Sequence, residues 1–165
     1  MPISDGLLQE LTMEAARTRA LLERLPEDKL AWKPHDKSMP LGRLATHIAE
    51  LPGWGTLTLE QDVLEMDGFT PTICDSVSAI LETHDKAVAE FEKVLNAAPD
   101  AEYAKTWTMK FNGQEVFSAP KMGVVRDFVL NHIVHHRGQL TVYLRLNDVP
   151  LPMTIGPSAD ETGEF

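Results

Sequence analysis

The sequence predicts an all-α fold, a four-helix bundle with a short β-hairpin inserted before the last helix. Four segments place apolar residues at helical spacing, and one segment before the last helix changes to the alternating pattern of a strand. A bundle is the simplest way for four amphipathic helices to bury their apolar faces around one core. The expected helices span residues 5–25, 40–64, 76–97 and 120–147, and the expected hairpin spans residues 106–117.

The first helix is expected over residues 5–25, because leucines recur there at helical spacing and Ser4 or Asp5 is a good N-cap. The segment 26–40 is rich in proline and charge, which predicts a loop. Within this loop Trp32 is a large apolar residue, and we expect it to cover one end of the bundle.

The second helix is expected to begin near Pro40, since the missing N–H of proline costs nothing in the first helical turn. Its apolar face consists of Leu41, Leu44, Ile48 and Leu51. His47 lies beside that face. Pro52 and Gly53 interrupt the pattern and predict a kink just beyond His47, because the proline ring clashes with the preceding turn.

The hairpin is predicted from the alternation of polar and apolar residues over 106–111, followed by Asn112-Gly113, a type I′ turn signal. A two-stranded ribbon is unstable alone. We therefore expect its apolar side chains to pack onto the helices: Trp107, Met109 and Phe111.

Histidines lie inside the apolar patterns of the third and fourth helices. His84 is interpreted as a packed core residue of the third helix. The fourth helix holds the run 131–139, NHIVHHRGQ, with three of the six histidines. Each residue of a helix advances about 100°, so with His132 at zero His136 falls near +40° and His135 near −60°. His132 and His136 therefore lie in the middle of the apolar stripe.

Two imidazoles one turn apart can bind the same ion, and imidazole is the commonest protein ligand of transition metals. Two alternatives remain from this pattern alone. His132 could pair with His135, a less well centred pair, or the histidines could be core and surface residues without a metal. Bundles build metal sites between facing helices, so His47 on the second helix has room to meet the fourth.

Length and charge narrow the class of protein. The 165 residues predict a single domain over 1–165, and the net charge of −10 without a basic patch argues against nucleic acid. Cys74 is the single cysteine, which excludes an intrachain disulfide and fits a reducing compartment. With no signal peptide and no apolar run of about 18 residues, we expect a cytoplasmic protein without membrane contact.

Three segments resemble the DinB/YfiT-like family of metalloenzymes: LATHIAELPGW (residues 44–54), NHIVHHRGQL (131–140) and GPSADE (156–161). The resemblance covers nearly the whole chain and implies a four-helix bundle, a homodimer and a bound divalent ion. It implies three metal ligands: His47, His132 and His136. Three further residues are candidates for a second shell or a pocket wall: His135, Trp54 and Tyr143. Arg137 points away from the metal side, so we expect it in packing or a salt bridge.

Three neutral histidines leave a coordination position open, which is typical of catalytic sites on Zn²⁺ or a similar Ni²⁺, Fe²⁺ or Mn²⁺ ion. The resemblance implies a thiol S-transferase, using a low-molecular-weight thiol such as bacillithiol or mycothiol, or a hydrolase of a small-molecule substrate. No glutamate separates the histidines, so a His-Glu-x-x-His protease is not supported. Glu50 is interpreted as a surface glutamate rather than a distant base. The alternative function is a non-catalytic, metal-binding or stress-related helical dimer.

Overall fold

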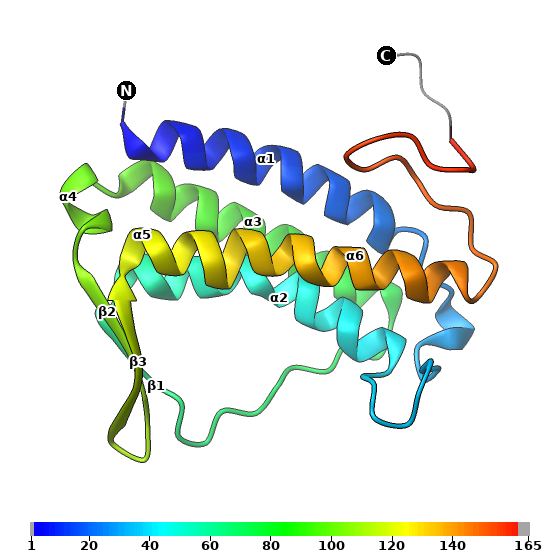
Figure 1. Ribbon diagram of the computed structural model, residues 1–165, viewed down its shortest axis with the longest axis horizontal. Coiled ribbons are helices and arrows are strands. Elements are labelled where there is room, and N and C mark those ends of the chain that lie inside the picture. Colours follow the sequence, from blue (N-terminus) through cyan, green and yellow to red (C-terminus); the bar gives the residue numbers. More distant parts are fainter. Residues whose placement is uncertain (1, 162–165) are drawn as a thin grey trace.

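The computed structural model describes residues 2–161, and within this range four long helices pack side by side with a small sheet at one end (Figure 1). The long helices are α1 (Ile3–Leu22), α2 (Leu41–Glu60), α3 (Val77–Ala97) and a fourth made of α5 (Lys121–Val124), a π-helical segment (Val125–Asn131) and α6 (His132–Arg145). Shorter elements are a 3₁₀ turn (Glu27–Lys29), α4 (Asp100–Tyr103), β1 (Val63–Glu65), β2 (Thr106–Phe111) and β3 (Gln114–Pro120). The predicted bundle with a hairpin before its last helix is confirmed.

The core consists of two apolar clusters that follow one another along the bundle. On the last helix, His136 lies between Ile133 of the first cluster and Leu140 of the second. His47 has the same place on α2, between leucines of the two clusters. The histidines therefore lie at the junction of the two clusters, where a polar group interrupts the apolar packing least.

The start of α1 differs from the prediction. The helix begins at Ile3, and its N-cap, Pro2, makes no side-chain hydrogen bond. Instead the Ile3 backbone N–H donates to Asp100 Oδ1 at 2.9 Å, so the free N–H group is satisfied from α4. The expected cap at Ser4 or Asp5 was wrong because the acceptor comes from a distant part of the chain.

The second helix continues through Pro52 to Glu60, so the proline lies inside the helix, and the kink expected just beyond His47 stays a prediction. The helix also ends earlier than expected. Residues 63–65 form β1, which pairs in parallel with residues 108–110 of β2 and makes a three-stranded sheet of order β1-β2-β3. A strand of three residues is too short to produce a readable alternation, and its partner lies far away in sequence.

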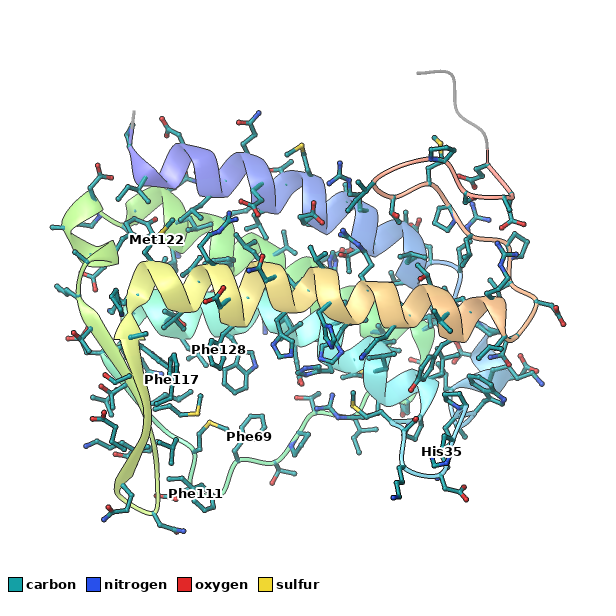
Figure 2. All side chains as sticks on the ribbon, viewed as in Figure 1. His35, Phe69, Phe111, Phe117, Met122 and Phe128 are labelled. Carbon is teal, nitrogen blue, oxygen red and sulfur yellow. The ribbon has the colours of Figure 1, made fainter. Side chains whose placement is uncertain are left out.

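The hairpin turn has the predicted geometry, with positive φ at Asn112 (50°) and Gly113 (69°). Trp107 is fully buried and Met109 is half-buried, as expected. Phe111 is 52% exposed, so its predicted packing onto the helices was wrong. It lies at the tip of the ribbon, beyond the reach of the bundle (Figure 2).

The last helix has the predicted extent but not a uniform register. The π-helical segment Val125–Asn131 occupies the turns just before His132. A π segment adds about one residue per turn, so the helical spacing changes just before His132, whereas the angles assigned to His135 and His136 lie within the regular α6. Such segments are frequent at functional sites.

The C-terminal segment returns over the helices and is held there by ion pairs. Asp160 forms an ion pair with Arg145 and accepts the Leu151 N–H, and Glu161 pairs with Arg24 at 2.7 Å. Within residues 2–161, none of the helices has the length and apolar character needed to cross a bilayer.

Candidate metal centre

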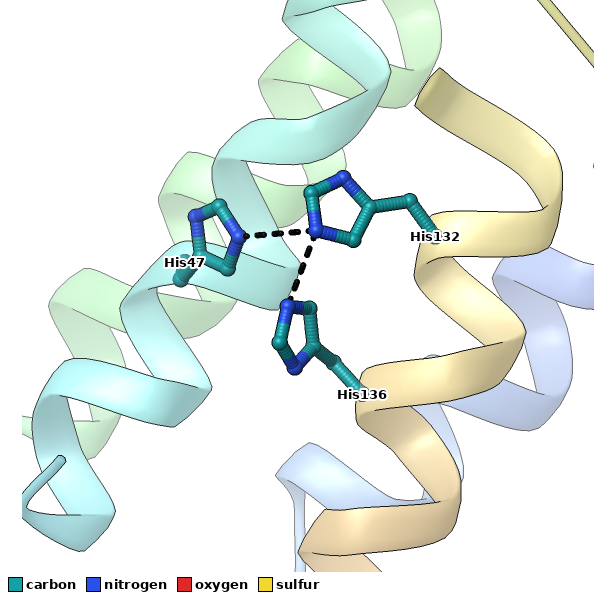
Figure 3. A group of neighbouring side chains, drawn as sticks. All are labelled: His47, His132 and His136. Carbon is teal, nitrogen blue, oxygen red and sulfur yellow. Dashed lines mark hydrogen bonds between the residues drawn. The ribbon is translucent and has the colours of Figure 1, made fainter. Parts of the chain in front are cut away.

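The three histidines singled out as ligands come together between α2 and the last helix (Figure 3). His47 Nε2 lies 3.4 Å from His132 Nε2, which lies 2.9 Å from His136 Nε2. All three nitrogens lie within 4.8 Å of one another. His132 is the middle member, and the regular α-helix from His132 onward places His136 one turn away on the same face.

The outer nitrogen of each ring faces an oxygen. His47 Nδ1 lies 3.2 Å from Glu50 Oε1, His132 Nδ1 lies 3.3 Å from the Phe128 carbonyl, and His136 Nδ1 lies 2.7 Å from Gln139 Oε1. Because an oxygen of this kind accepts, each Nδ1 carries the proton and donates it. Each Nε2 then presents a lone pair to the centre, the arrangement in which a histidine binds a metal.

Burial keeps two of the rings neutral. Burial lowers the pKa of His136, which is 9% exposed, to about 4, against a smaller opposing effect of its hydrogen bond to Gln139. Burial also lowers the pKa of His132, and the nearby His47 lowers it further. At neutral pH these imidazoles are therefore unprotonated, the state that metal binding requires.

The donor set fits a divalent transition metal. With the protons on the three Nδ1 atoms, a cation between the Nε2 atoms would be a partner for all three lone pairs. A tetrahedral ion with metal–nitrogen bonds of about 2.0–2.1 Å places its nitrogens about 3.3 Å apart. The 3.4 Å between His47 and His132 matches this spacing, and the 2.9 Å between His132 and His136 is shorter than it.

Glu50 has a defined role that the sequence interpretation missed. Its side chain is only 14% exposed and Oε1 accepts from both His47 and Arg43, each at 3.2 Å. Burial alone would raise the pKa of Glu50, but the hydrogen bond from His47 and the charge of Arg43 together hold it below its usual value. Glu50 is thus an ionised acceptor that orients His47, and its interpretation as a surface glutamate was wrong.

Gln139 is a second residue whose role the sequence did not reveal. Its amide oxygen accepts from His136, while its amide nitrogen donates to His135 Nε2 at 3.1 Å. His135 itself is exposed to solvent and does not belong to the three-nitrogen cluster. It is linked to the centre through Gln139.

A pocket of about 220 Å³ adjoins the centre, and His47 and His132 form part of its wall. The remaining lining residues are Leu51, Trp54, Met109 and Phe128. Trp54 therefore lies beside the centre. Tyr143 lies elsewhere, with its ring in an edge contact with Trp32 at 5.7 Å between centroids.

Arg137 follows His136 directly but faces the other side of the helix. It is 3% exposed, forms an ion pair with Glu14 of α1, and also donates to Thr18. The expected salt bridge is confirmed, and it ties the last helix to α1 rather than to the centre.

Comparison with known proteins identifies the family and the fold. Residues 10–140 match the DinB superfamily. The chain is 25% identical over 162 residues to the uncharacterized protein YrdA of Bacillus subtilis, covering 98% of this chain and 93% of that protein. The fold resembles a crystal structure of a DinB-like protein from Bacillus cereus, with a TM-score of 0.69 and 24% identity over 90% of this chain and 95% of that one. It also resembles the DinB-like protein YjoA of Bacillus subtilis, with a TM-score of 0.70 and 17% identity over 90% and 96% of the two chains.

The matched region contains His47, His132 and His136 together with the glutamate and glutamine that hold two of the rings. The family match thus covers the whole of the candidate centre and most of the bundle that positions it. The chain belongs to the DinB superfamily.

Proposed function

We propose that the protein is a divalent-metal-dependent enzyme that transfers a low-molecular-weight thiol to a small electrophilic molecule. One observation carries the proposal: three imidazole nitrogens converge beside an apolar pocket, so that an ion held by them would lie next to that pocket with room for a further ligand. Closed structural sites use four protein ligands, whereas a three-ligand site with an open position is typical of catalysis.

In this proposal the residues around the centre have distinct roles. His47, His132 and His136 hold the ion, while Glu50 and Gln139 hold two of these rings in the orientation that binding requires. When bound, the ion supplies a Lewis acid that lowers the pKa of a thiol or a water at the open position. The apolar side chains around the pocket limit access of bulk water and strengthen that effect.

The lining favours thiol transfer over hydrolysis, the second candidate reaction. Hydrolysis needs a base to activate water, yet within residues 2–161 the pocket is lined by no acid or base other than His47 and His132 themselves. A thiol ionises more easily than water and is a strong nucleophile once ionised. In the proposed reaction the thiolate sulfur forms a bond to an electrophilic carbon, the leaving group departs, and the thiol proton passes to solvent.

The three imidazole ligands narrow the identity of the ion to a group of transition metals. Imidazole nitrogen suits Zn²⁺, Ni²⁺ and Fe²⁺ better than hard cations, while Mn²⁺ binds nitrogen sites more weakly. We therefore expect zinc or nickel in protein purified from ordinary growth medium.

The test is a metal analysis of protein purified without a histidine tag, followed by turnover assays with thiols and electrophiles. We expect close to one metal per chain and turnover by the wild type but not by the His132→Ala variant. His35→Ala is the matched control, because His35 is an exposed loop histidine remote from the hairpin and the pocket (Figure 2). A molar ratio well below one would contradict the proposal, and a full complement of metal without turnover would favour the non-catalytic alternative.

A further inference from the structure

The pocket beside His47 and His132 is apolar on every other side. Within the described part of the chain, no lysine, arginine, aspartate or glutamate side chain lines it. Aromatic rings extend its walls outward: Phe69 contacts the edge of Trp54 at 5.7 Å between centroids, and Phe117 contacts Phe128 at 4.7 Å. Figure 2 shows Phe69, Phe117 and Phe128 on the same side of the bundle, near the hairpin.

Three separate parts of the fold build this pocket. Leu51 and Trp54 come from α2, Phe128 comes from the π-helical segment, and Met109 comes from β2. The hairpin therefore has a function in the site, since it supplies the wall opposite the two helices. Met109 also lies where the register between β2 and β3 shifts, and a shift of this kind changes the direction of a side chain.

The size of the pocket limits its occupant. A cavity of about 150 Å³ lined by apolar side chains binds benzene. At about 220 Å³ this pocket has room for one substituted ring or a branched aliphatic group of similar size. It is too small for a helix or a peptide segment.

The charges limit the occupant further. An anionic group in the pocket would lose its hydration without finding a lysine or arginine, and a cationic group would find no carboxylate. The net charge of −10 adds a long-range penalty for anions. An uncharged group meets neither penalty and gains from leaving water.

We propose that the pocket binds an uncharged aromatic or branched aliphatic group of a small molecule whose polar end reaches His47 and His132. This inference rests on the proposed function in one respect, that the polar end is the reacting end. On this proposal the substrate of the metal centre is a neutral, apolar compound and not a carboxylate or a phosphate.

The test uses fluorine NMR titrations under reducing conditions. Zinc-loaded protein is titrated with para-fluorophenylmethanethiol, with its carboxylate-bearing analogue, and with mercaptoethanol as a competitor without a ring. We expect the neutral ring thiol to bind about tenfold more tightly than either of the others, because it alone buries apolar surface without burying a charge. Equal affinities would overturn the inference and leave the proposed function standing.

Variants of the hairpin locate the binding. Met109→Lys places an ammonium group in the pocket wall and should weaken binding of the ring thiol about tenfold. Val116→Lys is the matched control, since Val116 is 57% exposed on β3 and should change the affinity less than twofold. If Met109→Lys fails to fold, Met109→Gln is the second variant. Undiminished binding by a folded Met109 variant would overturn the inference.

Metal-free protein separates the two proposals. Para-fluorophenylmethanol has no thiol, and we expect it to bind the metal-free wild type weakly and the Met109→Lys variant more weakly still. Ring binding in a protein that takes up no metal would support this inference and overturn the proposed function. An absence of ring-dependent binding in both forms would overturn the inference.

Discussion

Two helix interfaces of this bundle bury polar side chains, and they do so in opposite ways. Where α1 meets α3 and α6, the buried groups are complementary: Arg137 pairs with Glu14, and His84 donates to Asp85, which in turn binds Arg19. Where α2 meets α6, His47, His132 and His136 present three like lone pairs to one another. The first interface pairs opposite charges, whereas the second gathers three nitrogens that could hold a cation.

This comparison shows which property identifies a site. His84 is more deeply buried than His136, and burial lowers its pKa just as it does for His136, although Asp85 partly opposes the shift. Burial and a lowered pKa therefore do not distinguish a ligand from a core histidine. Convergence of several nitrogens, each with its outer proton donated away, does distinguish them.

The largest expected effect is on metal binding. His132→Ala removes the middle ligand, and we expect metal affinity to fall by more than about a hundredfold, because two histidines cannot hold the ion as three do. The unfolding free energy of the metal-free protein should change by less than about 1 kcal/mol, since the change breaks no ion pair and the bond from His132 to the Phe128 carbonyl is long, at 3.3 Å. Calorimetric titration with Zn²⁺ and urea denaturation measure the two quantities. A variant that unfolds would make His132 a structural residue.

The next largest effect is expected on stability, at the interface where Glu14 of α1 pairs with Arg137 of α6. Glu14→Leu leaves the Arg137 guanidinium, which is 3% exposed, without its carboxylate, and should lower the unfolding free energy by about 3–5 kcal/mol. Metal bound per folded chain should not change. The double variant Glu14→Leu/Arg137→Met is the control, and it should recover most of the loss because no unpaired charge remains buried. Additive losses in the double variant would contradict this account.

A smaller effect is expected from the group that orients a ligand. Gln139→Leu removes the acceptor of the His136 proton at nearly constant volume, and we expect metal affinity to fall about 10- to 100-fold. His135→Ala is the control, because His135 only accepts from the far side of Gln139 and its loss should matter severalfold less. Competition with a zinc chelator gives both constants. Equal losses of metal affinity in the two variants would contradict this account and show that His135 itself contributes to metal binding.

The smallest effect is a pH dependence of stability. The folded pKa of His84 lies below the unfolded value, so its contribution is fully present above about pH 6.5 and is lost as the pH falls toward the folded value. In metal-free protein the slope from this single group is at most about 1.4 kcal/mol per pH unit. His84→Asn should flatten the slope by up to that amount in urea denaturation between about pH 7 and pH 5. An unchanged slope would contradict this account, because it would show that His84 has the same protonation state in the folded and the unfolded protein.

Much of the fold could be predicted because it is encoded locally. The helical spacing of leucines marked the long helices, Asn112-Gly113 marked the hairpin, and a separation of four residues placed His132 beside His136. These features depend on neighbouring residues alone. The π-helical segment and the continuation of α2 through Pro52 were not predicted, because neither has a clear signal in the spacing of apolar residues.

The parts that could not be predicted have partners far away in the chain. Asp100 caps α1 and β1 pairs with β2, and neither element carries a signal for the other. Glu50 and Gln139 were visible one turn from a ligand, yet exposed glutamates and glutamines at that spacing are common. Only the rings' orientation shows that these two oxygens accept the protons of His47 and His136.

The amino-acid sequence by itself determined a helical bundle, a pair of histidines on one face of its last helix, and an acidic net charge of −10. The family resemblance added His47. Only the tertiary structure decided that three Nε2 atoms meet, that their outer nitrogens are all engaged, and that Met109 of the hairpin closes an apolar pocket beside them. The physical reason is that spacing along one helix is local geometry, whereas convergence depends on how α2, α6 and the hairpin pack.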